Sequence, residues 1–372
     1  MIGGNFDEKE YFKEKNIFYK IFNYLHKLYS FRSEKKYIKG LMSTCPEIKT
    51  LSKEQKRSIQ AWYKSHYGKK LPDYRWHAYY YTRNGVFSEK YIPNYVLSDI
   101  NKALYDPHIA AAFDDKNLYD TLFPDVLQPK TYVKCINGFY YDKNGPITRT
   151  EAISRCTDIG KVIIKPTYRS QNGRGVKHLE LRNGRDERAK DSVSDVFGNY
   201  GKNFIVQESI RQHERLSALC PTSVNTIRIV TYRRSESEVV VIYHVMRIGK
   251  FGSEVDNTSA GGMTCKIEEN GKLCKYAICS KPAGSFDKNE AGLIIENYEI
   301  PSFDKVVAKA KEMHLRLPHF IMIGWDFSVD EKGDVVFVEM NAPFGLHQPA
   351  AGPGYGKYTE EIFERCFGKP KC

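Results

Sequence analysis

The sequence has no long apolar run and no close cysteine pair. No stretch approaches the roughly 20 apolar residues that a membrane-spanning helix needs, and the first residues, MIGGNFDEKEYFKEKN, lack the apolar core of a secretory signal. The nine cysteines are scattered, the closest two are Cys274 and Cys279, and no CxxC motif occurs. These absences argue against a disulfide framework and a zinc site, and they predict a cytoplasmic protein with reduced thiols.

The composition is that of a globular protein. The chain has 372 residues, of which 41% are hydrophobic, 27% charged and 13% aromatic. This length allows two or three domains, and the hydrophobic content is sufficient to form a core.

Positive charge is concentrated near the N-terminus. The net charge is +12, and before about residue 75 Lys and Arg outnumber Asp and Glu roughly two to one. Ile17, Ile21 and Leu25 recur at helical spacing, which predicts a basic helix. Such a helix can pack on the body of the protein with its charges solvated, or contact an anionic membrane surface or a lipid-linked substrate. A nucleic-acid partner is not expected, because no nucleic-acid motif accompanies the charge.

The order of the predicted elements favours an α+β fold. One helix is predicted to start at an N-cap, Ser52, and to stop at Gly68. Residues 69–85 are predicted to be a loop, and further helices are predicted over 92–106, 110–123, 148–156, 303–317 and 359–367. Strands are predicted over 129–135, 138–142, 161–166, 176–181, 203–209, 226–233, 239–248, 272–278, 320–329 and 334–341. Strands in hairpin order with few helices between them indicate α+β rather than a doubly wound parallel sheet.

The last two predicted strands form a hairpin that carries two acids. They are joined by a polar turn, DEKGD. If the turn centres on its Lys-Gly step, Asp326 lies directly opposite Glu339, and Ser328 lies opposite Phe337. Asn341, two residues beyond Glu339, shares the same face. The hairpin is therefore predicted to present two acids and an amide together.

This face has the ligand chemistry of a magnesium site. Two facing carboxylates repel each other unless a cation lies between them. Carboxylate and amide oxygens suit Mg²⁺, with nucleotide phosphates completing its octahedron. Asp326, Glu339 and Asn341 are therefore candidate metal ligands. An exposed hairpin with incidental acids is the alternative, and it leaves the placing of acid opposite acid unexplained.

A Gly-rich segment lies between two predicted strands in KVIIKPTYRSQNGRGVKHLEL. Lys165 ends the first strand, and Gly173 and Gly175 allow the backbone to approach a ligand closely. Backbone N–H groups there can hold phosphate oxygens, with Lys165 as a point charge. The segment is not a Walker A loop, because its Lys precedes the glycines and a strand follows. A plain basic hairpin loop is the alternative.

Two arginines lie on successive predicted strands. Arg228 belongs to NTIRIVTYR and Arg247 to VIYHVMRIG, and Asn257 follows in the flexible turn VDNTSAGG. Arginines on adjacent strands beside a metal can neutralise a transferring phosphoryl group. Ordinary cross-strand salt bridging is the alternative.

From about residue 110 to residue 350, the order of these segments resembles the ATP-grasp superfamily. The resemblance implies that Lys116, in DDKNLYDTLF, and Lys165 contact ATP. It also implies that IVQESI is a hinge gripping adenine, with backbone contacts from Gln207 and Ile210 and a polar contact from Glu208. Downstream it places Arg228 and Arg247 at the phosphoryl or acyl-phosphate group, Asn257 near the phosphates, and Asp326, Glu339 and Asn341 around Mg²⁺.

Two segments, CPTSVNTIRIVTYR and SAGGMTC, look most like the sugar-transfer-associated branch, which is implied to act in making capsule and other surface polysaccharides. The Rossmann-like domain of larger members is not visible, and a basic helical segment occupies its place. The expected domains are a helical N-terminal region (1–95), a first ATP-grasp subdomain with the Gly-rich loop (96–205) and a second with the metal hairpin (206–372).

The expected activity is ATP-dependent ligation of a small-molecule carboxylate to an amine, through an acyl phosphate. The loop FGLHQPAAGPGYG, with His347 and Gln348, is expected on the acceptor side. The alternatives are a phosphotransferase that passes the γ-phosphate to a hydroxyl, and a non-catalytic nucleotide-binding module. The intact acidic triad argues against the non-catalytic module.

Overall fold

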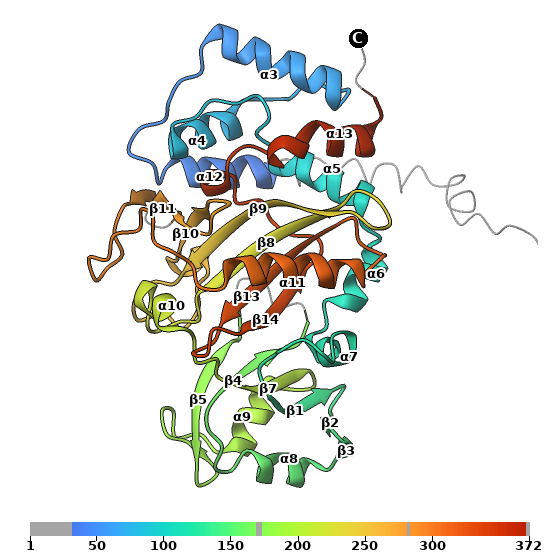
Figure 1. Ribbon diagram of the computed structural model, residues 1–372, viewed down its shortest axis with the longest axis vertical. Coiled ribbons are helices and arrows are strands. Elements are labelled where there is room, and N and C mark those ends of the chain that lie inside the picture. Colours follow the sequence, from blue (N-terminus) through green and yellow to red (C-terminus); the bar gives the residue numbers. More distant parts are fainter. Residues whose placement is uncertain (1–31, 169–172, 281–282, 370–372) are drawn as a thin grey trace, which may run out of the picture.

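Two antiparallel sheets of seven strands each form the body of the protein (Figure 1). The computed structural model describes residues 32–168, 173–280 and 283–369. Within these ranges every pair of neighbouring strands is antiparallel. The predicted α+β class is therefore confirmed.

The first sheet has the strand order β3-β2-β1-β7-β4-β5-β6. Its strands are β1 (Thr131–Ile136), β2 (Phe139–Asp142), β3 (Gly145–Ile147), β4 (Gly160–Pro166), β5 (Lys177–Arg182), β6 (Arg185–Asp186) and β7 (Phe204–Glu208). Helices α8 (Arg149–Arg155) and α9 (Val193–Tyr200) share one buried core with this sheet. Val162 and Ile164 of β4 point into that core, so Ile163 and Lys165 point to the opposite face.

The second sheet has the strand order β12-β11-β10-β9-β8-β13-β14. Its strands are β8 (Thr226–Arg233), β9 (Val239–Ile248), β10 (Met263–Ile267), β11 (Leu273–Ser280), β12 (Ala283–Phe286), β13 (Met322–Val329) and β14 (Val335–Asn341). Helix α11 (Phe303–Leu315) contacts β8, β9, β13 and β14. Shorter elements connect the strands: α10 (Glu214–Leu219), η2 (Thr258–Ala260), α12 (Gln348–Ala351) and η3 (Gly356–Tyr358).

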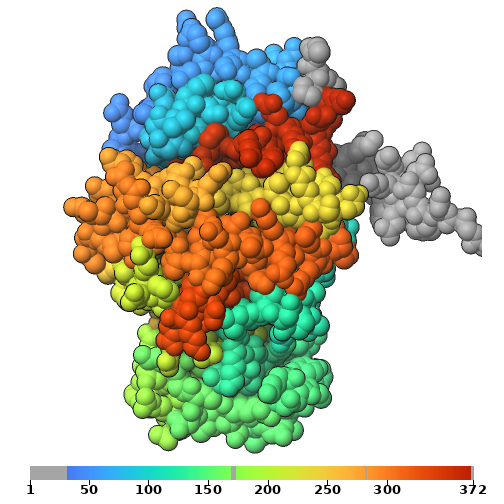
Figure 2. All heavy atoms as spheres, viewed as in Figure 1, coloured from blue at the N-terminus to red at the C-terminus, as the bar shows by residue number. Residues whose placement is uncertain are grey.

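Residues 32–104 form a helical layer, here called the N-terminal layer, at the end of the molecule opposite the first sheet (Figure 2). It contains a helix over residues 32–42 and then α3 (Lys53–His66), α4 (Arg75–Asn84) and α5 (Asn94–Leu104). Helix α6 (Pro107–Phe113), η1 (Lys116–Leu118) and α7 (Tyr119–Leu122) follow it along the side of the second sheet (Figure 1). The C-terminal helix α13 (Thr359–Phe367) packs into this layer, with the rings of Trp62 and Phe363 4.8 Å apart. Helices α3 and α13, from opposite ends of the chain, therefore share one core.

Local signals predicted most of these elements. Ser52 caps α3 in a capping box with Gln55, and α5 ends before Pro107, as predicted. The prediction of a loop over 69–85 is wrong, because α4 forms there. Residues 110–123 are not one helix either, because α6 ends at Phe113 and two short turns follow.

Tertiary packing explains why α4 escaped prediction. Its buried face is made of Trp76, His77, Tyr79 and Tyr80, whose aromatic side chains have weak helix propensity and carry polar groups. These rings become a helix face only because the helix over residues 32–42 and the loop with Tyr91 cover them.

Most of the predicted basic helix, including Ile17, Ile21 and Leu25, lies outside the described residues. Its membrane contact stays a prediction, as do the domain boundaries after residues 95 and 205. Of the helices that the structure does describe, none combines the length and the apolar character needed to cross a membrane.

Candidate active site

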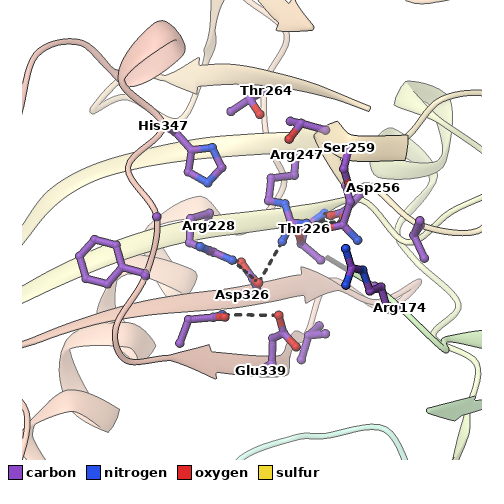
Figure 3. A pocket seen from close by; sticks show the side chains of 18 of the residues that line it. Arg174, Thr226, Arg228, Arg247, Asp256, Ser259, Thr264, Asp326, Glu339 and His347 are labelled. Atoms are coloured by element: carbon purple, nitrogen blue, oxygen red, sulfur yellow. Dashed lines mark hydrogen bonds and ion pairs between the residues drawn. The ribbon is translucent and has the colours of Figure 1, made fainter. Parts of the chain in front are cut away.

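A cavity of about 1080 Å³ lies between the two sheets and reaches the N-terminal layer. Gly175 and Gln348 do not line it, whereas the other site residues predicted from the sequence do. These lining residues are Lys116, Lys165, Gly173, Gln207, Glu208, Ile210, Arg228, Arg247, Asn257, Asp326, Glu339, Asn341 and His347. Figure 3 shows the arginines and acids at its centre.

The acidic hairpin has the predicted register at its functional end. Asp326 and Glu339 are partners on β13 and β14. Nearer the turn the prediction is wrong, because a β-bulge after Asp326 pairs Phe337 with Phe327 rather than with Ser328. The shift places both aromatic rings in the core, with centroids 5.9 Å apart.

Two arginines neutralise the Asp326 carboxylate, which is 1% exposed. Arg228, its partner on β8, donates hydrogen bonds to both carboxylate oxygens, and Arg247 donates to Oδ2 at 3.1 Å. Burial acts to raise the pKa of Asp326, but the guanidinium charges lower it, so the carboxylate is ionised. The two arginines therefore offset part of the charge that a cation between the two acids was expected to balance.

On its other side, Arg247 is held by the turn that carries Asp256 and Asn257. Its Nη2 lies 2.8 Å from Oδ1 of Asp256 and also donates to Asn257 Oδ1. Thr226 donates to Asp256 through its backbone N–H at 3.2 Å and through its hydroxyl. Burial raises the pKa of Asp256, although Arg247 opposes this effect. Asp256 and Thr226 were not predicted, because an Asp in a polar turn carries no periodic signal.

Two lysines, Lys116 of η1 and Lys165 of β4 in the first sheet, lie near the second acid. Lys116 Nζ lies 3.6 Å from Glu339 Oε2, and its backbone N–H donates to the carbonyl of Thr167, just beyond β4. Lys165 lines the cavity from β4. Burial lowers the pKa of Lys165 to about 8, the charge of Lys116 adds to this effect, and Glu339 opposes it. This end of the cavity is therefore a cationic site with one carboxylate.

The lowered pKa of Lys165 predicts pH-dependent nucleotide binding. Only the protonated amine attracts phosphate, and its protonated fraction in the free protein falls as the pH rises through about 8. We expect ATP affinity to weaken between about pH 7.5 and 9.5, by at most about tenfold per unit. Isothermal titration calorimetry should show this trend in the wild type and a flat profile in Lys165→Arg. A decline of equal slope in both proteins would contradict the assignment.

Gly173 of the Gly-rich loop lies against the turn between β9 and β10 that carries Asn257. Gly173 and Gly175 have φ of 68° and 75°, which glycine adopts without strain. A Cβ on Gly173 would collide with the side-chain amide of Asn257, and one on Gly175 would lie 2.9 Å from Pro166 Cγ. Arg188, in the segment after β6, forms an ion pair with Glu254. At Gly173 and Gly175 the packing leaves no room for a side chain, so both glycines have a packing role whether or not they contact phosphate.

The predicted hinge includes the end of β7, the neighbour of β4 in the first sheet. The side chain of Gln207 is used within its own sheet, because Nε2 donates to Thr131 Oγ1 at 3.1 Å. Glu208 is exposed and lines the cavity together with Ile210 and Ile163. This wall therefore offers an apolar surface with one accessible carboxylate beside it.

The oxygen donors at the hairpin suit Mg²⁺. The Glu339 side chain is 28% exposed, its Oε2 lies 3.6 Å from Lys116, and its Oε1 accepts from the Asn341 amide at 3.4 Å. Asp326 accepts from arginines, but a carboxylate has about four lone-pair positions and can still bind a cation. In the described part of the chain no group of three or more His, Cys, Asp or Glu could hold a metal. A magnesium ion here would thus need the Asn341 oxygen and nucleotide phosphates as well.

The two residues of the predicted acceptor loop have different environments. His347 points into the cavity beside the arginines (Figure 3), and burial and their charges hold its pKa well below its usual value. Gln348 does not line the cavity. Its amide bonds the backbone N–H and C=O of Ile92, each at 2.8 Å. Gln348 therefore ties the loop to the N-terminal layer, which corrects its expected role at the acceptor.

Comparison with known proteins identifies one family and a set of similar folds. The family described as "Sugar-transfer associated ATP-grasp" matches residues 97–362. Among solved structures, the ADP complex of N5-carboxyaminoimidazole ribonucleotide synthetase is 13% identical, covering 63% of this chain and 46% of that one with a TM-score of 0.35. The D-Ala:D-Ser ligase VanG from Enterococcus faecalis is 13% identical, covering 70% of this chain and 62% of that one with a TM-score of 0.40.

The matched region spans less than two thirds of these solved structures. The same synthetase from Thermotoga maritima is 10% identical, covering 72% of this chain and 53% of that one with a TM-score of 0.37. No curated protein matches the chain.

Proposed function

The chain belongs to the sugar-transfer associated ATP-grasp family, and on this premise we propose that it is an ATP- and Mg²⁺-dependent ligase that joins a carboxylate to an amine. The observation that supports this proposal best is the row Glu339, Asp326 and Arg228 across three neighbouring strands, facing Lys116 and Lys165. An acid pair, arginines and lysines around one cavity suit phosphoryl transfer from a metal-bound nucleotide.

Nucleotide binding is assigned to the first sheet, its loop and η1. Lys116 and Lys165 attract the phosphates, and Gly173 allows the loop backbone to approach them. The adenine lies against Ile163 and Ile210, where Glu208 is accessible. Bound between Asp326, Glu339 and Asn341, Mg²⁺ would neutralise phosphate charge.

The reaction needs positioning and charge neutralisation rather than a covalent nucleophile. A substrate carboxylate oxygen attacks the γ-phosphorus, the bond to the β-phosphate oxygen breaks, and ADP leaves. The amine nitrogen then attacks the acyl carbon, an amide forms and phosphate leaves. Arg228 and Arg247 stabilise charge on the transferring group, and the neutral His347 can accept the proton that the amine loses.

The proposed substrates are small molecules, a sugar or amino-acid derivative used in making surface polysaccharides in the cytoplasm. The test is a screen of carboxylate and amine pairs for ADP release, with product identified by mass spectrometry. An amide product whose formation needs both substrates supports the ligase. ADP release without amine, with a stable phosphorylated hydroxyl product, would instead identify a phosphotransferase. Tight ATP binding with no turnover across the panel would contradict both enzymes and favour a binding module.

A further inference from the structure

On the second sheet, the charged side chains that line the cavity end at β9. Thr226, Arg247, Thr264 and Ile278 are successive register partners on β8, β9, β10 and β11, and all four line the cavity. Acids and arginines occupy β14, β13, β8 and β9, whereas β10 and β11 contribute a hydroxyl and an alkyl side chain. One cavity therefore has a charged part and an uncharged part.

The hydroxyl of Thr264 has no protein partner. Thr264 is 3% exposed, and its Oγ1 forms no hydrogen bond with any residue that the structure describes. Figure 3 places it at the cavity beside Ser259 and His347. A buried hydroxyl without a partner is costly, so its retention on a cavity wall indicates a ligand that bonds to it.

The N-terminal layer closes the uncharged part. Helix α12 contacts α4, β10 and β11, so these four elements surround one space. From α4 come Trp76, Tyr79 and Tyr80, and the Tyr79 hydroxyl is bonded to Ser280 of β11. The residues of these four elements that line the cavity carry no charged side chain; they are Trp76, Tyr79, Tyr80, Thr264, Ile278, Ser280, Pro349 and Ala350.

We propose that this compartment, formed by α4, α12, β10 and β11, binds the uncharged ring of a saccharide substrate. The inference deepens the proposed ligase and rests on it. Aromatic rings cover the apolar face of a sugar ring, while Ser and Thr hydroxyls can both donate to and accept from its hydroxyls. The guanidinium of Arg83 on α4 is already bonded to the carbonyls of Cys279 and Gly284, so a nucleotide's phosphates or the charged groups of an amino acid would find no charged side chain among the lining residues of these elements.

The position of the compartment gives the orientation of the saccharide. Thr264 is the register partner of Arg247, so a ring bonded to Thr264 lies next to the arginines. Its reactive substituent, a carboxylate or an amine, then points to Arg247 and His347, where the acyl phosphate is formed and consumed. The N-terminal layer thereby selects the substrate while the two sheets hold ATP.

The test uses the full chain with Mg²⁺ and a non-hydrolysable ATP analogue. The methyl glycosides of glucose, galactose and mannose serve as uncharged saccharide probes, and L-glutamate as the charged comparison, in saturation-transfer difference NMR. Thr264→Val keeps the shape and removes the unpartnered hydroxyl. We expect it to weaken binding of at least one glycoside about five- to tenfold, the effect of one hydrogen bond. ATP affinity, measured by calorimetry, should change less than about twofold.

Ser328→Ala is the matched control, because Ser328 is also buried and its hydroxyl lacks a partner among the described residues, but it does not line the cavity. It should leave glycoside binding unchanged. Ala350→Trp places a large side chain in the compartment from α12 and should abolish glycoside binding. It provides a second test if Thr264→Val folds poorly.

The outcomes separate this inference from the ligase proposal. If the wild type binds ATP but no glycoside, or if Thr264→Val affects L-glutamate rather than the glycosides, the saccharide assignment is overturned. If the wild type binds a glycoside through Thr264 but does not bind ATP, the saccharide site stands and the ligase proposal fails.

Discussion

Replacing Glu339 with Gln is expected to lower ATP-dependent turnover about 100-fold or more while leaving the fold intact, as for groups that act on transition-state charge. Glu339 is only partly buried and forms no short ion pair in the described structure, its contact with Lys116 being 3.6 Å. Its carboxylate is therefore free to hold Mg²⁺ and to oppose the lysine charges around ATP. The amide keeps the size of the side chain and loses the charge.

Steady-state ADP release measures the loss of turnover, and a thermal melt checks that the fold is intact. Glu331→Gln is the matched control, because Glu331 is exposed in the turn of the same hairpin. It should behave as the wild type in both assays. A Glu339→Gln variant with wild-type turnover would remove this residue from the proposed metal set, and one that unfolds would show that its role is structural.

Replacing Asp326 with Asn is expected to destabilise the protein by about 3–5 kcal/mol, because it leaves a buried guanidinium without its counter-charge. Arg228 and Arg247 both donate to Asp326, and all three side chains are buried. Although the acid pair looks symmetrical in the sequence, Asp326 carries the folding role and Glu339 does not. Turnover should fall as well, because the arginines lose the partner that positions them.

Urea denaturation followed by circular dichroism gives the free energy of unfolding. Asp334→Asn, on the exposed turn of the same hairpin, should lie within about 0.5 kcal/mol of the wild type. The double variant Asp326→Asn with Arg228→Gln should recover part of the lost stability, because it removes the unpaired charge. An Asp326→Asn protein as stable as the wild type would mean that the arginines need no buried counter-charge.

The local patterns were sufficient for much of the fold. The Ser52 cap, the long strands and the pairing of Asp326 with Glu339 depend on residues close in sequence, where periodicity and turn chemistry determine the geometry. The β-bulge after Asp326 escaped prediction because it depends on two aromatic rings finding space in the core. Helix α4 escaped for the same reason, since its Trp and Tyr side chains are recognised as a helix face only once their covering elements are in place.

By itself, the sequence determined that two acids face each other on one hairpin, since an alternating strand and a short turn fix those positions locally. Only the tertiary structure decided how the charges are distributed. Arg228 is 98 residues from Asp326, and Asp256 and Thr226 join Arg247 through a turn. The uncharged compartment is likewise built from α4 and β11, which are far apart in the chain. Such contacts depend on the packing of distant elements, and no local period in a sequence encodes that packing.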